Sequence, residues 1–266
     1  MAGQTIDRRR FNQLLAGLAA GAGVSHVMRA VSAAAATPKL PLIMLDAGHG
    51  GVDPGAIGLA GTYEKDISLP TVQELARQLE ATRRFQVRLT RRDDQFIPLA
   101  GRVALARRAD AQLFMSVHAD ALPDRQMRGA SVYTLSEQAS DKEAAALAAR
   151  ENKADLVAGV KLPSDDPVVS GILIDLARRQ TNNLSIQLAQ ELVSELGRRV
   201  TLLRNSHRSA GFAVLKAPDI PSALVEIGCL SNRDEEHALR ASAYQAKVAQ
   251  GLTRSINEYF DTAGRA

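Results

Sequence analysis

Short apolar runs alternate with helix-length segments along most of this chain, and this alternation constrains the fold more than any other feature. The expected strands, rich in Val, Ile, Leu and Phe, are residues 42–46, 85–90, 113–118, 130–135, 211–215 and 222–228. The expected helices are residues 64–82, 98–109, 140–159, 171–197 and 242–260. Strands that alternate with helices are typical of a parallel sheet covered on both faces. The pattern predicts an α/β fold, a three-layer sandwich around a mostly parallel central sheet.

Two of the expected helices carry signals for where they bend or end. Pro70 lies inside the expected helix 64–82, so an irregularity or kink is expected near its start, because proline cannot donate a backbone hydrogen bond. Gly197 follows a long amphipathic run and should end that helix. The Ala-rich segment 140–159 has high helix propensity, and the sequence "PSDDPVVS" that follows at 163–170 should interrupt the chain.

The first 36 residues resemble an export signal. They have a basic start, a weakly apolar Ala/Gly/Leu centre and small residues at 33–36 that suit cleavage. The sequence "RRRF" at 8–11 resembles the twin-arginine export signal, whose substrates cross the membrane folded. A basic amphipathic helix on the domain surface is the alternative interpretation. We expect a twin-arginine signal peptide at residues 1–36 and a linker at 37–41.

The charge distribution does not predict a nucleic-acid-binding surface. The formal net charge is +4, but four arginines and one aspartate give +3 within residues 1–36. The folded part therefore carries only about +1. The single cysteine, Cys229, cannot form an intramolecular disulfide. No apolar stretch approaches the roughly 20 residues of a membrane-spanning helix, so we expect no membrane span in the mature protein.

Polar residues that suit metal binding stand at the ends of expected strands. His49 and His118 follow or end two of these strands, and Glu226 lies near the end of a third. Ligands of open α/β sheets gather outside the carboxyl ends of the strands, so we expect these side chains to converge at one edge. Glu64 begins a helix fifteen residues after His49 and can face the same edge.

Two imidazoles and one carboxylate form a ligand set typical of catalytic zinc. Three protein ligands leave a fourth position for water, whose pKa falls to about 7 on zinc. A second carboxylate could act as base toward that water and as acid toward a leaving amine, and Glu226 in its apolar strand is the candidate. Spacing alone also allows an ordinary surface histidine at position 49 and a hydrogen-bonded core histidine at position 118.

Other uses of these residues are less favoured. The sequence "GHGGVDPG" could cradle a phosphate, but it lacks the Lys-Ser/Thr of a P-loop and the spacing of a dinucleotide fingerprint. His207 and His237 lie in polar contexts, so we expect both on the surface.

Four segments in order give the strongest indication of function. They are "LDAGHGGVDPGAIG", "YEKDISL", "FMSVHAD" and "PSALVEIGCLSN". Over roughly residues 42–260 the chain resembles the zinc-dependent N-acetylmuramoyl-L-alanine amidases of the amidase-3 type, which are cell-wall hydrolases. The resemblance implies one Zn²⁺ held by His49, Glu64 and His118, with Glu226 as the catalytic glutamate. It also implies cleavage of peptidoglycan at the amide between the lactyl group of N-acetylmuramic acid and L-alanine.

The similarity is closest to the periplasmic cell-division amidases of Gram-negative bacteria. The segments "RENKADLVAGV" and "ILIDLARRQTNNLSIQLAQ" resemble their inserted region, which places a regulatory helical insertion at about 137–170 within a catalytic domain at 42–262. In those relatives an inserted helix covers the site, its glutamate reaches the zinc, and an activator protein with a LytM-type domain displaces it. Glu151 is the matching position here, and a solvated glutamate is the alternative. The resemblance implies a periplasmic enzyme that acts in daughter-cell separation and wall remodelling.

Three departures and two rival functions remain. Ala47 replaces the proline of the usual Asp-Pro-Gly-His, so we expect a slightly less rigid approach to His49. Cys229 stands where a bulky apolar residue is common, and Ser209 stands where relatives often carry glutamine. The linker leads directly into the first strand, so targeting by an N-terminal wall-binding domain is not expected.

The rival functions are a zinc peptidase or deacetylase acting on wall fragments, and a non-catalytic wall-binding or regulatory module with a vestigial metal site.

Overall fold

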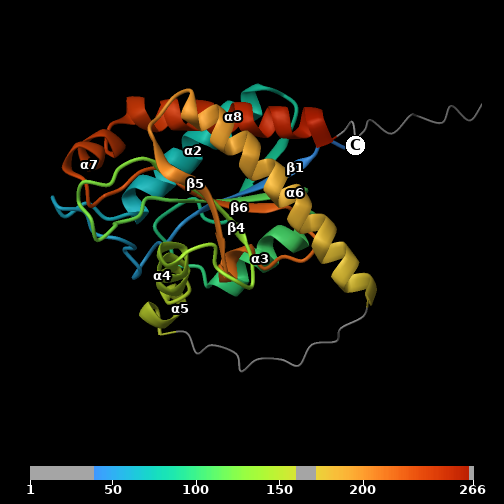
Figure 1. Ribbon diagram of the computed structural model, residues 1–266. Helices are drawn as coiled ribbons and strands as arrows, with labels where there is room; N and C mark the ends of the chain where they lie inside the picture. The colour runs from blue at the N-terminus through green and yellow to red at the C-terminus, as the bar shows by residue number, and fades with distance from the viewer. Residues whose placement is uncertain (1–38, 160–171, 264–266) are drawn as a thin grey trace, which may run out of the picture. The chain divides into compact units, whose positions relative to one another are not determined.

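The computed structural model describes residues 39–159 and 172–263, and in the second range it describes the side chains of residues 178–262 (Figure 1). The predicted signal peptide, the first two residues of the linker and residues 160–170 of the predicted insertion lie outside the described residues. The strands are β1 Leu42–Ala47, β2 Gln86–Leu89, β3 Leu113–His118, β4 Ala130–Leu135, β5 Leu202–Ala210 and β6 Ser222–Glu226. The helices are α2 Lys65–Ala81, α3 Leu99–Arg108, α4 Lys142–Glu151, α5 Ala154–Val157, α6 Ile172–Gly197, α7 Arg233–Leu239 and α8 Ser242–Ala263, with a 3₁₀ turn η1 at Ala213–Leu215.

The described strands form one mixed sheet in the order β2-β1-β3-β6-β4-β5. The pairs β1–β2, β1–β3, β3–β6 and β4–β5 are parallel, and β4–β6 is antiparallel. Ala47 pairs with Val117, and His118 pairs with Glu226. The carboxyl ends of β1, β3 and β6 therefore meet at one edge of the sheet, which we call the rim.

Helices cover both faces of the sheet. On one face α2, α6 and α8 pack together over the strands, and α3, α4 and η1 lie on the other (Figure 1). Successive side chains of β1 point to opposite faces of the sheet. Ile43 and Leu45 belong to one apolar cluster, and Leu42 and Met44 belong to the other. A strand buried on both faces reads as a continuous apolar run, as "LIMLD" does. The predicted α/β sandwich is confirmed, and no helix among the described residues is long and apolar enough to cross a membrane.

The predicted strand at 211–215 is wrong. Residues Ala213–Leu215 form the 3₁₀ turn η1, while Phe212, Val214 and Leu215 are buried. The backbone of this segment bonds to a side chain: Asn152 accepts from the amide of Ala213 at 2.7 Å and donates to the carbonyl of Gly211 at 2.8 Å. An apolar run shows that a segment is buried, but here tertiary contacts decide the backbone conformation.

Two elements have no counterpart among the predicted ones. The strand β5 lies at the edge of the sheet and carries polar residues in the sequence "LLRNSHRSA", so it lacks a clear apolar alternation. The short helix α7 is capped by Asn232, whose side chain accepts from the amides of Asp234 and Glu235. An asparagine followed three residues later by glutamate is a known start signal for a helix, so α7 could have been predicted.

The predicted helix at 140–159 is also wrong in its continuity. It begins as α4, capped by Asp141, whose carboxylate accepts from the amide of Ala144 at 2.7 Å. The helix stops after Glu151, and a second short helix, α5, starts at Ala154. The intervening Asn152 turns its side chain toward η1. By contrast, α2 continues through Pro70, and α6 ends at Gly197 as predicted.

Candidate metal centre

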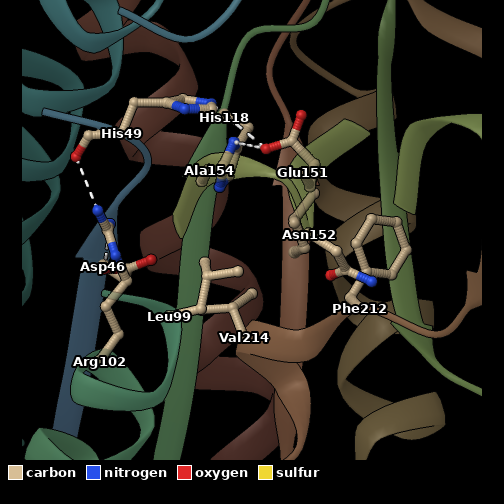
Figure 2. Close-up of a pocket in the computed structure, with 11 residues that line it drawn as sticks. Asp46, His49, Leu99, Arg102, His118, Glu151, Asn152, Ala154, Phe212 and Val214 are labelled. Atoms are coloured by element: carbon tan, nitrogen blue, oxygen red, sulfur yellow. Dashed lines mark hydrogen bonds and ion pairs between the residues drawn. The ribbon is translucent and has the colours of Figure 1, made fainter. Parts of the chain in front are cut away.

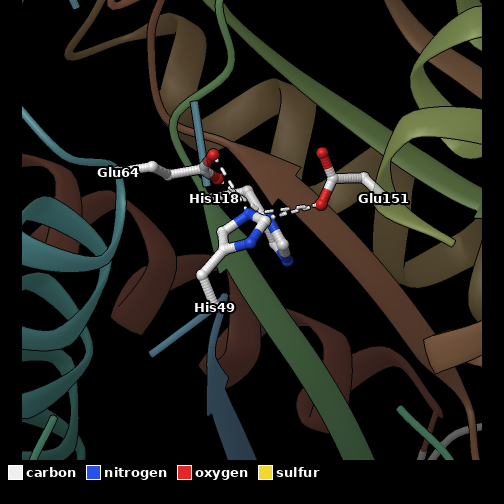
Figure 3. A group of neighbouring side chains, drawn as sticks. All are labelled: His49, Glu64, His118 and Glu151. Carbon is white, nitrogen blue, oxygen red and sulfur yellow. Dashed lines mark hydrogen bonds and ion pairs between the residues drawn. The ribbon is translucent and has the colours of Figure 1, made fainter. Parts of the chain in front are cut away.

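Four buried side chains converge at the rim (Figure 3). They are His49, Glu64, His118 and Glu151, and one ligand atom from each lies within 4.8 Å of the others. Glu64 is 3.0 Å from His49 Nε2 through one oxygen and 2.9 Å from His118 Nδ1 through the other. The sequence therefore located three side chains that the fold does bring together, although they come from three different segments.

The backbone that carries His49 is held in an unusual conformation by two buried arginines. His49 has a φ of 60°, in the left-handed region that costs most residues about 1–3 kcal/mol. Arg102 donates to the carbonyl of His49 at 2.8 Å, and Arg91 donates to the carbonyl of Gly48 at 2.8 Å. Both arginines also donate to the carbonyl of Ala47. The looser approach expected from Ala47 is therefore opposed by four hydrogen bonds in the fold.

Two glycines near His49 leave room for the ligand side chains. A Cβ at Gly48 would lie 2.5 Å from Cε1 of His118. A Cβ at Gly55, whose φ is +70°, would lie 2.5 Å from Cδ2 of His49 and 2.6 Å from Oε2 of Glu64. Contacts this short do not occur between real atoms, so no side chain fits at either position. The glycines are needed for close approach as well as for the turn.

Each imidazole is oriented by a hydrogen bond on the side that faces away from the cluster. Asp53 Oδ2 accepts from His49 Nδ1 at 2.8 Å, which directs Nε2 toward Glu64. His118 Nε2 donates to Ser116 Oγ at 3.0 Å, and Ser116 in turn donates to Asp46 at 2.6 Å. A carboxylate behind a ligating histidine is the usual way proteins fix its tautomer and strengthen it as a ligand.

Asp46 anchors this support from beneath the rim. Its carboxylate is fully buried and accepts from Arg102 at 2.9 Å and from Thr90 at 2.5 Å. Burial acts to raise the pKa of Asp46, but Arg102 and the hydroxyl donors outweigh burial and lower it. Asp46 is therefore ionised and can orient the Ser116 hydroxyl.

Two backbone amides hold the Glu64 carboxylate, and α7 holds the loop that leads to it. Backbone amides of Ala119 and Ala56 donate to its two oxygens at 3.0 and 2.8 Å. The loop between His49 and Glu64 is held from outside by Glu236 of α7, which accepts from the amide of Ala60 at 3.0 Å. Glu236 is 2% exposed, so these hydrogen bonds are shielded from water.

The electrostatics of the cluster fit a divalent cation. Burial disfavours charge on both imidazoles, but the facing carboxylates outweigh burial, raising the pKa of His118 to about 10 and that of His49 well above its usual range. Burial acts to raise the pKa of both carboxyls, but the imidazoles outweigh it, holding Glu151 at about 2 and Glu64 well below its usual range. Two ring protons thus balance two carboxylates, and one divalent ion in place of those protons would leave the same charge.

One unpaired atom also points into the cluster. His49 Nε2 is buried and makes no hydrogen bond, and it faces carboxylate oxygens of Glu64 at 3.0 Å and of Glu151 at 3.3 Å. An imidazole nitrogen without a donor or acceptor partner, aimed at carboxylate oxygens, suits a metal ligand. The residues present therefore fit a metal site made of imidazole and carboxylate.

Glu226 lies beside the cluster with a different environment. It pairs with His118 on β3 and with Ser131 on β4, so it stands at the rim between two strands. It is 3% exposed, and neither carboxylate oxygen has a hydrogen-bond partner among the described residues. Burial raises the pKa of Glu226 well above its usual range, and the charge of Asp120 adds to this. Such a carboxyl can carry a proton near neutral pH and release it.

The helices α4 and α5, residues 142–157, close over the rim, and we call them the lid. Glu151 Oε2 lies 3.3 Å from His49 Nε2 and 3.2 Å from His118 Nδ1. Glu151 contacts His118 directly, and both line a cavity of about 10 Å³, which has room for about one water molecule (Figure 2). A polymer cannot reach the cluster while the lid stays in this position.

Polar contacts tie the lid to the body of the domain. Asn152 bonds to the backbone of the 211–213 segment, as described above. In addition, Asp155 of α5 accepts a hydrogen bond from the amide of Leu99 at 2.9 Å. Arg150 forms an ion pair with Asp120, which is 3% exposed and lies just beyond β3. Burial raises the pKa of Asp120 to about 6, although Arg150 acts in the opposite direction.

His207 and His237 are exposed, as expected. Cys229 is buried. The supporting residues Asp46, Asp53, Ser116 and Asp120 were not predicted. Three of them could have been predicted from their spacing to the histidines. Asp53 lies four residues after His49, and Ser116 and Asp120 lie two positions before and after His118.

Comparisons with known proteins agree with the geometry. Residues 43–258 match the Amidase_3 family, described as N-acetylmuramoyl-L-alanine amidase. The chain is 42% identical over 220 residues to the amidase AmiC of Escherichia coli O6:H1, covering 82% of this chain and 52% of AmiC. It is 40% identical over 220 residues to AmiA of Salmonella typhimurium, covering 82% of this chain and 76% of AmiA. The chain thus spans about half the length of one relative and three quarters of the other.

Solved structures show the same fold. The catalytic domain of the amidase CwlV from Bacillus (Paenibacillus) polymyxa matches with a TM-score of 0.58 and 26% identity, covering 84% of this chain and 99% of that one. The amidase CwlD of Clostridioides difficile, in complex with the GerS lipoprotein, matches with a TM-score of 0.61 and 26% identity, covering 84% and 99%.

Proposed function

This chain belongs to the N-acetylmuramoyl-L-alanine amidase family Amidase_3, and we propose that it is a zinc-dependent enzyme that cuts peptidoglycan. The bond cleaved is the amide between the lactyl group of N-acetylmuramic acid and L-alanine of the stem peptide. One observation carries the proposal: His49, Glu64 and His118 converge at the rim beside Glu226, a buried carboxyl with no hydrogen-bond partner. A vestigial site would not be expected to retain both the ligands and the acid.

The residues divide into those that hold the metal and those that move protons. His49, His118 and Glu64 would hold Zn²⁺, which supplies a Lewis acid for the carbonyl and lowers the pKa of water. Glu226 in its ionised form would take a proton from the attacking water and, as the acid so formed, would deliver it to the departing amine of L-alanine; its raised pKa favours holding that proton between the two steps. Asp53 and Ser116 keep the two imidazoles in the tautomers that ligation needs.

We propose that the lid makes the structure described here a resting state. Glu151 would supply a further ligand to the zinc, and α4 fills the approach to the rim. An activator protein with a LytM-type domain would displace the lid. One solved relative, CwlD, is bound to a partner protein, the GerS lipoprotein. A closed resting state suits a wall hydrolase, because unregulated cleavage would lyse the cell.

We also propose that the chain acts in the periplasm after twin-arginine export, in daughter-cell separation and wall remodelling. The proposal is supported by the arginine pair within residues 8–10 and by the Gram-negative sources of the similar amidases. Export in a folded state would allow metal loading before transport.

The test is a digest of purified peptidoglycan by zinc-loaded protein with the lid released by Glu151→Ala together with Asn152→Ala. Mass spectrometry should find free stem peptides that begin with L-alanine, and a Glu226→Gln version of the same protein should release none. Shortened peptides still attached to the glycan would indicate a peptidase, and loss of acetyl groups a deacetylase. No product of any kind, from well-folded metal-loaded protein, would favour a binding module.

A further inference from the structure

We propose that Asp120 is a substrate-binding residue whose carboxylate accepts a hydrogen bond from a backbone N–H of the stem peptide once the lid has moved. The inference rests on the proposed function and adds to it a second contact beside the metal. It comes from two adjacent lid residues, Arg150 and Glu151, which occupy two adjacent positions on the rim.

The two lid side chains present one donor and one acceptor. The Arg150 guanidinium donates to Asp120, while a carboxylate oxygen of Glu151 lies 3.2 Å from His118 Nδ1. The two groups are close to each other, since Arg150 Nε is 3.9 Å from Glu151 Oε1. In the closed state the lid therefore places an oxygen acceptor, from Glu151, beside the two histidines and a hydrogen-bond donor, from Arg150, at Asp120.

A peptide near its cleavage point presents the same pair of groups. The scissile carbonyl supplies the oxygen, and the following amide bonds supply N–H donors a few bonds away. A stem peptide placed with its carbonyl toward His49 and His118 can therefore place an N–H at Asp120. The lid thus imitates the substrate with two neighbouring side chains.

Asp120 is held in place independently of the lid. The amide of Ala121 donates to Oδ1 at 2.5 Å, and the amide of Leu230 donates to the carbonyl of Asp120 at 2.7 Å. Leu230 lies in the loop just after β6, so Asp120 is fixed relative to the strand that carries Glu226. Moving Arg150 away would leave the carboxylate ordered but without its charged donor, so a ligand that supplies an N–H at this position can take the place of that donor.

The competing explanation is that Asp120 serves only to hold the lid. The two explanations differ in a protein whose lid is already released. We therefore use a parent that carries Glu151→Ala and Asn152→Ala for release and Glu226→Gln to prevent turnover. Its affinity for a soluble muramyl peptide is measured by calorimetry, and its zinc affinity by competition with a chromophoric chelator.

Adding Asp120→Ala to this parent should weaken muramyl-peptide binding about 10- to 100-fold, the usual loss for a hydrogen bond to a charged group. Asp120→Asn keeps an acceptor oxygen and should lose less than about 5-fold. Arg150→Gln, the matched control on the lid, should leave the affinity unchanged. Zinc affinity should be unchanged in all three.

Three results would decide against the inference or against its premise. Equal peptide affinity in the parent and in Asp120→Ala would overturn the substrate contact and leave Asp120 as a lid anchor. A loss in Asp120→Asn as large as in Asp120→Ala, with lowered zinc affinity, would show a structural role and also overturn it. If the parent itself binds no muramyl peptide but binds zinc, the proposed function fails, and this inference fails with it.

Discussion

Asn152→Ala should raise the activity that the enzyme shows without an activator. The side chain makes two hydrogen bonds to the backbone of the 211–213 segment, at 2.8 and 2.7 Å, and is not itself one of the proposed metal ligands. Each bond contributes about 0.5–1.5 kcal/mol, so closure of the lid should weaken by about 1–3 kcal/mol. If the lid is mostly closed, the open fraction should rise by about 5- to 150-fold, and activity with it.

The assay is release of stem peptide from purified peptidoglycan in the absence of any other protein. Asn257→Ala is a matched control, because that asparagine also bonds through its side chain, to Arg84 and to the carbonyl of Thr253, but lies on α8. The control should keep the low starting activity. Unchanged activity in folded Asn152→Ala protein with full metal content would refute the claim that these two bonds hold the lid.

Three further predictions concern the metal site. Asp53→Ala should weaken zinc binding by about 10- to 100-fold in a chelator competition, because His49 loses the partner of its Nδ1; an unchanged affinity would remove Asp53 from the site. Glu236→Ala should also weaken zinc binding, because the loop leading to Glu64 loses its brace, whereas Glu236→Gln retains an acceptor and should bind nearly as the parent does; equal affinity in both variants would contradict this. Removing the metal with a chelator should lower the melting temperature by about 5–10 °C, because an ion present at about 100 times its Kd stabilises the folded chain by about 2.7 kcal/mol; an unaltered melting curve would count against a metal in the folded protein.

Much of the site could be predicted because it depends on strand ends. In a mostly parallel sheet the carboxyl ends of β1, β3 and β6 meet at one edge, so residues at those ends must be neighbours. That rule predicts from the sequence that His49, His118 and Glu226 lie together. The lengths of apolar runs likewise predicted most strands and helices to within a few residues.

The remaining features depend on contacts that the sequence pattern does not record. The apolar run at 211–215 predicts a strand, but its backbone bonds to Asn152, which lies far away in the sequence. The same asparagine marks the break between α4 and α5. Periodicity showed a helix near Glu151, but only tertiary packing directs that carboxylate at His49 and His118.

The central claim is that His49, Glu64 and His118 bind one zinc ion at the rim. Anomalous X-ray scattering at the zinc edge, from crystals of the zinc-loaded protein, tests it most directly. The account predicts one strong peak per chain, within ligand distance of His49 Nε2, His118 Nδ1 and the Glu64 carboxylate. A peak elsewhere on the chain, or none at this cluster in fully loaded protein, would contradict it.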